Sequence, residues 1–372
     1  MSISVSGIGL TQFGELWNKS FEDLIEEATN KALENAKCTI HEIDAVFLAS
    51  MLSGETTSQS QAGAIIASLY GVHIPVFRLE AACASGGIAV YQAIQNLRAG
   101  TFNKVLVVGS EKMTDHSVED ISAMLMQAAS EEERLSGATF PALYAMMAKS
   151  HMQEFGTKEE DFAKSSVISH KNGTQNPKAH FQREFSIEQV LKSAPVADPL
   201  KLLDCSPISD GAAAIILENT EKAEIEILAE SSASDSLSLN NREKLTELKS
   251  TQITTEKLFS KIEISKKNID LIEVHDCFSI AGLMALEDIG FCKKGEGGKC
   301  LEKILNNDPE LPKYNLSGGL KAGGHPVGAT GVKQIAEVAL QFQKNPQMKY
   351  GLTHNVGGTG ATCVMHLLKR NS

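Results

Sequence analysis

The sequence predicts an α/β protein with a mostly parallel sheet covered by helices. Short apolar runs alternate with longer helix-like stretches along most of the 372 residues. Alternation of this kind is typical of βαβ units, whose strands lie parallel. It occurs twice, over 1–220 and over 224–372, and no Gly/Ser-rich linker separates the two. We therefore expect two copies of one α/β unit, fused into a single body.

The first copy begins with an alternating segment, 1–7, that has the pattern of a strand. Apolar runs and the amphipathic stretches between them give the remaining elements in order. We expect strands at 45–48, 74–79, 104–108 and 211–217, and helices at 58–70 and 84–97.

The second copy repeats this order of elements. Its last two apolar runs follow each other with only a glycine-rich segment between them. We expect strands at 225–228, 269–274, 350–353 and 362–368, and helices at 243–259, 281–289 and 332–343.

The alternation is interrupted from about 115 to about 203, by a polar segment with many Met, His and Asn residues. Between Lys164 and Lys201 there are six Lys/Arg against three Asp/Glu, although the chain as a whole is acidic. One interpretation is a solvated insertion in the first copy. The other is a lid that holds a phosphate-bearing ligand through its basic side chains.

Composition excludes several classes of function. A net charge of -11 argues against nucleic acid as a partner. The seven cysteines are scattered, with no CxxC pair and no Cys/His spacing of a metal site. They indicate reduced thiols, and hence a cytoplasmic protein without a metal. The sequence also shows no signal peptide and no apolar run long enough for a membrane.

Cys83 is the residue for which the sequence indicates chemical reactivity most clearly. It lies between the expected strand 74–79 and the expected helix 84–97, at a strand-to-helix turn. A helix N-terminus carries partial positive charge, which favours a thiolate and so a better nucleophile. The small residues at 84–87 would let a substrate approach. A small buried cysteine that fills the start of a helix is the alternative.

Three further loops follow expected strands, at 273–278, 323–331 and 354–360. In open α/β sheets, sites form on the loops at the carboxyl ends of strands. Each loop alone also has a purely structural interpretation. His325 could be part of a turn, Cys277 could be packed at the end of a strand, and the glycines could form a tight turn. Together with the Cys83 loop, they predict one site that contains Cys83, His275, Cys277, His325 and Gly357.

In these motifs the chain resembles the thiolase family over essentially its whole length. The resemblance rests on Glu80-Ala-Ala-Cys-Ala-Ser-Gly-Gly87, His275-Asp-Cys-Phe278 and Gly324-His-Pro-Val-Gly-Ala-Thr-Gly331. The segments 137–144 and 204–211 are typical of the branch with archaeal acetoacetyl-CoA thiolases and sterol-carrier-protein-type thiolases. The resemblance implies a five-layered αβαβα body with a loop-domain insertion in its first half.

The resemblance also implies a mechanism through an acyl-cysteine. Cys83 would attack the first acyl-CoA, and His325 would take its proton and later sit beside the thioester oxygen of the second substrate. The backbone N–H groups of Cys83 and Gly357 would bind the oxyanion. His275 would hold the enolate oxygen of the second substrate.

One position departs from the pattern of many thiolases. They carry a second catalytic cysteine just before the last glycine motif, where this chain has Asn355. We expect Cys277 to supply the missing acid/base, as in the sterol-carrier-type branch. Cys363, eight residues further on, is expected to be buried in the last strand.

Substrate contacts are expected from the insertion. Lys171, Lys178 and Arg183 could meet the phosphates of coenzyme A. Tyr144 and Met147 could line the pantetheine tunnel or the acyl pocket, with core packing as the alternative. Coenzyme A thioesters are then the substrates, and no tightly bound cofactor or metal is expected.

The leading prediction is an acetyl-CoA C-acetyltransferase that makes or cleaves acetoacetyl-CoA. The alternatives are a thiolase for longer 3-ketoacyl-CoA, a CoA- or lipid-binding protein with little turnover, and a ketoacyl synthase, which the Gly-His-Pro loop disfavours. The resemblance further implies a homodimer or homotetramer. In an archaeal setting it implies transfer of the product to a hydroxymethylglutaryl-CoA synthase through a small scaffold protein.

Overall fold

The computed structural model describes residues 2–371. Its strands are β1 (Ser2–Leu10), β2 (Ala45–Ala49), β3 (Val76–Leu79), β4 (Lys104–Glu111), β5 (Pro195–Ala197), β6 (Leu200–Lys201), β7 (Gly211–Thr220), β8 (Ile225–Ser234), β9 (Leu271–Glu273), β10 (Lys313–Tyr314), β11 (Tyr350–Gly357) and β12 (Thr362–Arg370). Its α-helices are α1 (Phe21–Ala36), α2 (Ser53–Thr56), α3 (Gly63–Tyr70), α4 (Ser85–Arg98), α5 (Val118–Leu125), α6 (Glu131–Leu135), α7 (Phe140–Phe155), α8 (Glu159–Gly173), α9 (Ile187–Leu191), α10 (Lys249–Phe259), α11 (Ser279–Ile289), α12 (Gly297–Leu305) and α13 (Thr330–Lys344).

The main sheet is mixed, so the expectation of a mostly parallel sheet is wrong. Its strand order is β10-β9-β11-β12-β8-β1-β7-β4-β2-β3. Strands β2 and β9 are parallel to both neighbours, whereas β7 and β12 are antiparallel to both of theirs. For β12 the cause is local, because only four residues, 358–361, connect it to β11. A parallel pairing would need a crossover of a dozen residues or more.

The two halves of the sheet repeat one pattern, as predicted. One half runs from β3 to β1 and the other from β10 to β8. In each half, counted from the edge strand, the first two pairings between neighbouring strands are parallel and the next two are antiparallel. The halves join through a single pair, Ser4 of β1 opposite Glu226 of β8. The division of the chain at 220 and 224, and the bounds of the insertion, stay predictions.

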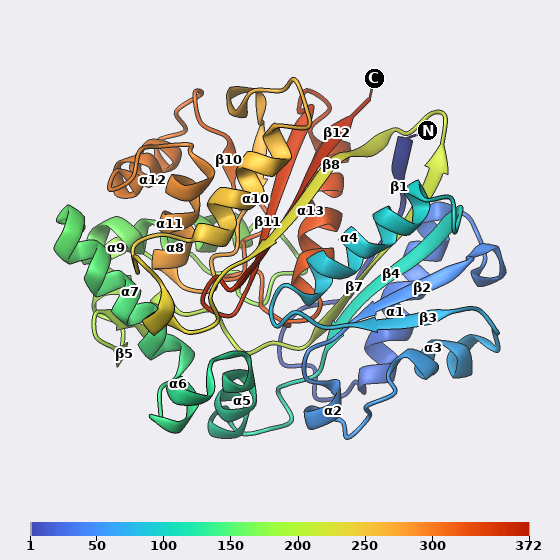
Figure 1. Ribbon diagram of the computed structural model, residues 1–372, viewed down its shortest axis with the longest axis horizontal. Coiled ribbons are helices and arrows are strands. Elements are labelled where there is room, and N and C mark those ends of the chain that lie inside the picture. Colours follow the sequence, from blue (N-terminus) through green and yellow to red (C-terminus); the bar gives the residue numbers. More distant parts are fainter. Residues whose placement is uncertain (1, 372) are drawn as a thin grey trace.

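Five layers result, because helices lie outside each half and also between the two (Figure 1). Residues of α1 and α3 pack on one face of the first half, and α10 and α11 pack on the outer face of the second. Helices α4 and α13 share one hydrophobic cluster with both halves. Strand β7 shows the alternation that this requires: Ala212 and Ala214 face α1, whereas Ala213 and Ile215 face the middle layer.

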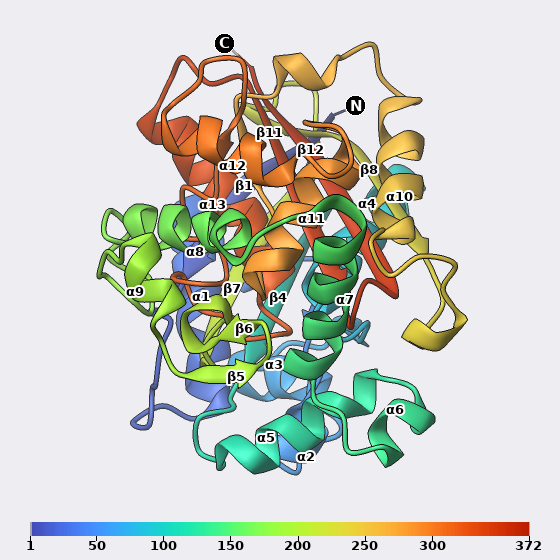
Figure 2. The ribbon, with the colours of Figure 1, turned by 90° about the vertical axis from the view of Figure 1, so that its left-hand side faces the viewer.

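The segment at 115–203 is largely helical and contributes to the core, so it is not merely a solvated insertion. Figure 2 shows helices α5 to α9 together on one side of the body. Helices α7 and α8 bury Tyr144, Met147 and Phe162 against α11. The apolar residues occupy one face of each helix. This amphipathic pattern was not recognised in the sequence because the segment as a whole is polar.

Two expected helices begin later than predicted. Helix α3 starts at Gly63 instead of residue 58, and α10 starts at Lys249 instead of residue 243. The N–H of Leu248 donates to the carboxylate of Asp288 at 2.8 Å, which fixes the chain outside the helix at this point. No helix between residues 2 and 371 combines the length and the apolar character that spanning a bilayer requires.

The N-terminal ends of α4 and α13 touch through their backbones. A Cβ on Gly331 would lie 2.0 Å from the amide nitrogen of Gly87, and one on Gly86 would lie 2.8 Å from the Gly331 nitrogen. No side chain other than hydrogen fits at such separations. The contact brings the loop before α4 and the loop before α13 together, and these loops contain Cys83 and His325.

Substitution Gly331→Ala tests the importance of this contact. The new methyl group would meet backbone atoms, which cannot move aside as a side chain would. We expect a loss of about 3 kcal/mol in the free energy of unfolding, measured by urea denaturation. Gly54→Ala is the matched control, because its Cβ would lie at an ordinary 3.5 Å from the nearest heavy atom, Ser60 Oγ. Equal stability of the two variants would contradict the interpretation.

Candidate active site

Cys83 lies in a strained turn between β3 and α4. The preceding residue, Ala82, has a φ of 53°, in the left-handed region that non-glycine residues rarely adopt. Its N–H donates to the Glu80 carboxylate, and the Ser85 hydroxyl donates to its carbonyl at 2.6 Å. These bonds hold the turn in its strained form. Cys83 is therefore presented just before the first turn of α4.

His325 lies in the loop that leads into α13. The Ser209 hydroxyl accepts its backbone N–H at 3.1 Å. Its Nδ1 lies 2.7 Å from the Thr330 hydroxyl, which itself donates to the Pro326 carbonyl at 3.0 Å. Because the hydroxyl proton is used in this way, the Thr330 oxygen accepts from Nδ1–H. The Nε2 lone pair of a neutral His325 then remains available as a base.

His275 and Cys277 follow β9 and precede α11. The Asp276 carboxylate between them points away from the site, where it accepts from the Ser169 hydroxyl and the Leu320 N–H. This acid therefore anchors the loop, and it does not line the pocket beside Cys83. The carbonyl of Cys277 accepts the Ser206 N–H at 2.8 Å, so both sides of the loop are fixed.

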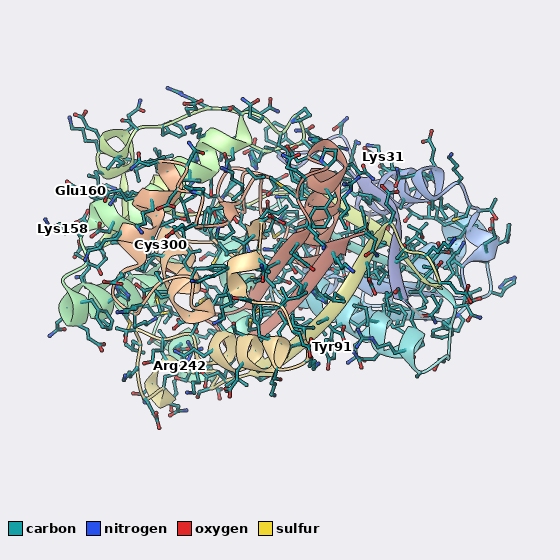
Figure 3. The ribbon with its side chains drawn as sticks, turned by 90° about the horizontal axis from the view of Figure 1, so that it is seen from above. Lys31, Tyr91, Lys158, Glu160, Arg242 and Cys300 are labelled. Atoms are coloured by element: carbon teal, nitrogen blue, oxygen red, sulfur yellow. The ribbon has the colours of Figure 1, made fainter. Side chains whose placement is uncertain are left out.

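The hairpin between β11 and β12 supplies a glycine on the far side of Cys83. Gly358 has a φ of 60°, and its backbone N–H acts to lower the pKa of the nearby Cys83 thiol. Gly357, which the sequence suggested as the oxyanion donor, is one residue earlier and pairs with Thr362 in the strand, and its role stays a prediction. Arg242, labelled in Figure 3 before α10, donates to the Thr359 carbonyl at 2.6 Å and so secures the hairpin.

The structure brings three of the predicted residues into one cluster. The Cys83 sulfur and one ring nitrogen each of His275 and His325 all lie within 4.8 Å of one another. The two imidazoles meet edge to face, with centroids 5.0 Å apart and planes at 85°. The residues come from three different loops, and together they bring one thiol and two imidazoles into one cluster.

A pocket of about 210 Å³ opens above the thiol. Cys83, Cys277, His325 and Gly358 lie in its wall, together with Tyr144. The rest of the lining is mostly apolar and comes largely from the segment at 115–203 and the loop after it. These further lining residues are Met113, Val118, Ser122, Leu125, Phe140, Pro141, Cys205, Ser206, Pro207, Ile208, Phe278 and Val327.

Burial decides the protonation states. It raises the pKa of Cys83 to about 12, although the Gly358 N–H opposes the shift. The expected thiolate at a helix N-terminus is thus outweighed by desolvation. Burial also lowers the pKa of His325 to about 3 and that of His275 well below its ordinary value. The resting site therefore holds a neutral thiol and two neutral imidazoles.

Four of the predicted substrate contacts lie elsewhere. Met147 is buried in the core and does not line the pocket, whereas Tyr144 does. Lys171 borders a separate hollow beside Tyr314. The Lys178 ammonium donates to the Leu10 carbonyl at 2.6 Å, and the exposed Arg183 lies over the Phe185 ring. The CoA role of the three basic residues stays a prediction.

Three contributors were not identified from sequence. Gly358 was indistinguishable from its glycine neighbours, because only the backbone angle selects it. Thr330 follows His325 at i+5, a spacing that could have suggested its hydrogen bond. Asn355 was noted only as a replaced cysteine, yet its side chain bonds to Cys83, Gly87 and His275.

Two models of known protein families match this chain. The family model described as thiolase, N-terminal domain, matches residues 4–221. The model described as thiolase C-terminal domain-like matches residues 231–370. The chain belongs to the thiolase family. The two matches cover the loops that contain Cys83, His275, Cys277 and His325, so the site is built from both parts of a thiolase.

Individual relatives agree with this assignment. The thiolase described here is 44% identical to an acetyl-CoA acetyltransferase of Methanocaldococcus jannaschii, over 98% of both chains. It is 32% identical to sterol carrier protein 2 of Rattus norvegicus, over 97% of this chain and 71% of that protein. The human mitochondrial 3-ketoacyl-CoA thiolase in complex with CoA has the same fold, with a TM-score of 0.78, 16% identity and coverage of 100% and 98% of the two chains.

The buried neutral histidines predict a pH dependence of stability. Burial lowers the pKa of His366 to about 3, so the folded state excludes a proton that the unfolded state binds below about pH 6.5. Unfolding then takes up this proton, and stability falls as the pH decreases from 6.5.

We expect His366→Gln to lose less stability than the wild type on acidification. The difference should reach about 2 kcal/mol between pH 6.5 and pH 5, since each pH unit corresponds to about 1.4 kcal/mol. Urea denaturation at each pH measures it. Parallel pH profiles of the two proteins would show that His366 is protonated in the folded state after all.

Proposed function

We propose that this thiolase is an acetyl-CoA C-acetyltransferase, which joins two acetyl-CoA molecules into acetoacetyl-CoA and catalyses the reverse cleavage. The observation that carries the proposal is the cluster of Cys83, His275 and His325 beside Cys277, at the wall of one apolar pocket. The relatives named acetyl-CoA acetyltransferase and their 44% identity support the choice of acyl group.

In the first half-reaction the Cys83 sulfur attacks the thioester carbonyl while His325 Nε2 takes the thiol proton. In this proposal attack and proton transfer are concerted, because burial raises the pKa of Cys83 and so disfavours a free thiolate. We assign the N–H of Cys83, together with the N–H of Gly357 or Gly358 in the hairpin, as the donors to the oxyanion that develops. The C–S bond to CoA then breaks, and the CoA sulfur receives the proton from His325. The product is an acetyl group on Cys83.

In the second half-reaction a proton leaves the methyl group of the second acetyl-CoA. His325 Nε2, neutral again after the first half-reaction, takes the proton of the Cys277 thiol, and the resulting thiolate accepts the methyl proton while the enolate oxygen receives a hydrogen bond from His275. Burial beside Cys83 raises the pKa of Cys277 well above its ordinary value, so the thiolate is a strong base once formed. The enolate carbon attacks the acyl group, the bond to Cys83 breaks, and the Cys83 thiolate takes the proton that His325 holds, while Cys277 keeps the methyl proton.

The route for coenzyme A runs outward from the pocket. A second, more open hollow shares Val118, Ser206, Pro207 and Ile208 with the pocket. The shared residues show that the two hollows are adjacent, and in this proposal the extended pantetheine arm of CoA runs from the second hollow to Cys83. In this proposal coenzyme A thioesters are substrates and not a resident cofactor.

The apolar lining favours one second candidate, the cleavage of longer 3-ketoacyl-CoA. Leu125, Phe140 and Phe278 in the pocket wall could contact an alkyl chain. A series of 3-ketoacyl-CoA substrates of increasing chain length distinguishes the two functions through kcat/KM. The expected homodimer or homotetramer, the synthase and the scaffold protein stay predictions.

The proposal is tested by thiolysis of acetoacetyl-CoA. Purified protein with acetoacetyl-CoA and free CoA should remove the enolate absorbance of the substrate, and Cys83→Ala should lose this activity by at least about 10³-fold, because the covalent route is gone. Cys38→Ala, which changes a partly exposed cysteine at the end of α1, serves as the matched control. Loss of absorbance that is independent of Cys83 would refute the mechanism.

Cys277→Ala separates the two half-reactions. We expect acylation of Cys83 by acetyl-CoA to continue, since His325 and the oxyanion donors remain. Condensation and thiolysis should both stop, because the proton at the enolate carbon has no acceptor or donor. Intact-protein mass spectrometry detects the acetyl group, and the absorbance assay follows turnover. Turnover in the variant, or absence of the acetyl adduct, would each contradict the assigned role.

A further inference from the structure

Asn355 occupies the centre of the site and uses every hydrogen-bonding group of its amide. The side chain is buried, with an exposed fraction of 1%. Its Oδ1 accepts the Gly87 N–H at 3.1 Å. Its Nδ2 donates to the Cys83 carbonyl at 3.0 Å and lies 3.2 Å from Nδ1 of His275. One amide therefore connects the nucleophile loop, the start of α4 and the imidazole after β9.

Two backbone groups fix the orientation of this amide. Gly87 is the third residue of α4, so its N–H has no acceptor within the helix and can only donate. The Cys83 carbonyl can only accept. Exchange of the amide oxygen and nitrogen of Asn355 would place donor against donor at Gly87 and acceptor against acceptor at Cys83. The observed orientation is therefore the chemically consistent one.

The orientation dictates the tautomer of His275. An N–H of Asn355 points at Nδ1, so Nδ1 must offer its lone pair. Burial holds the pKa of His275 well below its ordinary value, so the ring is neutral and carries one proton. That proton must reside on Nε2. Within residues 2–371, Nε2 of His275 is buried and has no hydrogen-bond partner, so its N–H is free to donate.

His325 has the opposite arrangement. Its Nδ1–H donates to Thr330, which leaves a lone pair on Nε2. The two imidazoles, 5.0 Å apart, are of the same residue type and both neutral. Only their hydrogen-bond partners differ.

We propose that Asn355 is a positioning residue that keeps His275 protonated on Nε2, so that His275 donates to the substrate oxyanion while the neighbouring His325 accepts the thiol proton. The proposal rests on the acyltransferase function proposed above, and it assigns a task to the asparagine that replaces the second cysteine of many thiolases. Without Asn355, His275 could place its proton on either nitrogen and would lose its role as a donor for part of the time.

The tautomer can be observed directly in the resting protein. With 15N-labelled histidine, two-bond proton–nitrogen correlation spectra distinguish a protonated ring nitrogen from a bare one, and His275→Gln assigns the signal. We expect Nε2 protonated and Nδ1 bare in the wild type. A wild-type His275 with its proton on Nδ1 would overturn the proposal. This measurement needs neither substrate nor turnover, so it is separate from the test of the function.

Asn355→Asp reverses the direction of the critical hydrogen bond. The carboxylate still accepts from Gly87, but it can only accept from His275, so the proton should move to Nδ1. We expect kcat to fall by about 10²- to 10³-fold at a pH where the ring is neutral, because one oxyanion donor is lost. As the pH is lowered, protonation of the ring restores Nε2–H, and the activity of the variant should rise.

Asn219→Asp is the matched control, because the Asn219 amide also donates to a backbone carbonyl, that of Leu97, at 2.8 Å. It should leave both the His275 signal and the pH profile unchanged. An Asn355→Asp protein that retains the proton on Nε2 and loses activity equally at every pH would show a merely structural role and overturn the proposal. A confirmed tautomer in a protein without thiolysis would instead refute the function alone.

Discussion

The backbone contact between the N-terminal ends of α4 and α13 is the constraint on which the site depends. The nucleophile precedes one of these helices and the base precedes the other. The two loops can meet only because the glycines at 86 and 331 leave no side chain between the helices. Both helices form the middle layer, where each is packed against the two halves of the sheet, so their relative position is fixed by the whole body. The candidate active site of this duplicated fold therefore lies where its two corresponding helices touch.

The sequence identified most of the chemistry, because reactive residues lie at the ends of strands and local motifs reveal them. Cys83, His275, Cys277 and His325 were placed in one site from such motifs, and the structure brings them together. The alternation of elements likewise predicted the duplicated α/β body. Each of these inferences needed only neighbours in the chain.

Features that depend on distant partners were not predictable in this way. The bond from Gly87 to Asn355 joins residues 268 positions apart, so no local pattern could assign a role to the asparagine. The position of Gly358 in the pocket wall depends on one backbone angle in a hairpin. The protonation state of Cys83 was misjudged, because the helix N-terminus is visible in sequence whereas the burial that outweighs it is not. The sheet appeared parallel because the pairing of β7 and β12 follows from tertiary packing and connection length.

The cluster of one thiol and two imidazoles has the composition of a zinc site, with its ligand-type atoms within 4.8 Å of one another. A divalent metal ion requires a lone pair from every ligand. His275 presents a proton at Nε2 instead, and releasing it would require the Asn355 amide to break its two bonds to the backbone. The hydrogen bonds that prepare this site for an oxyanion therefore also make it a poor trap for metals.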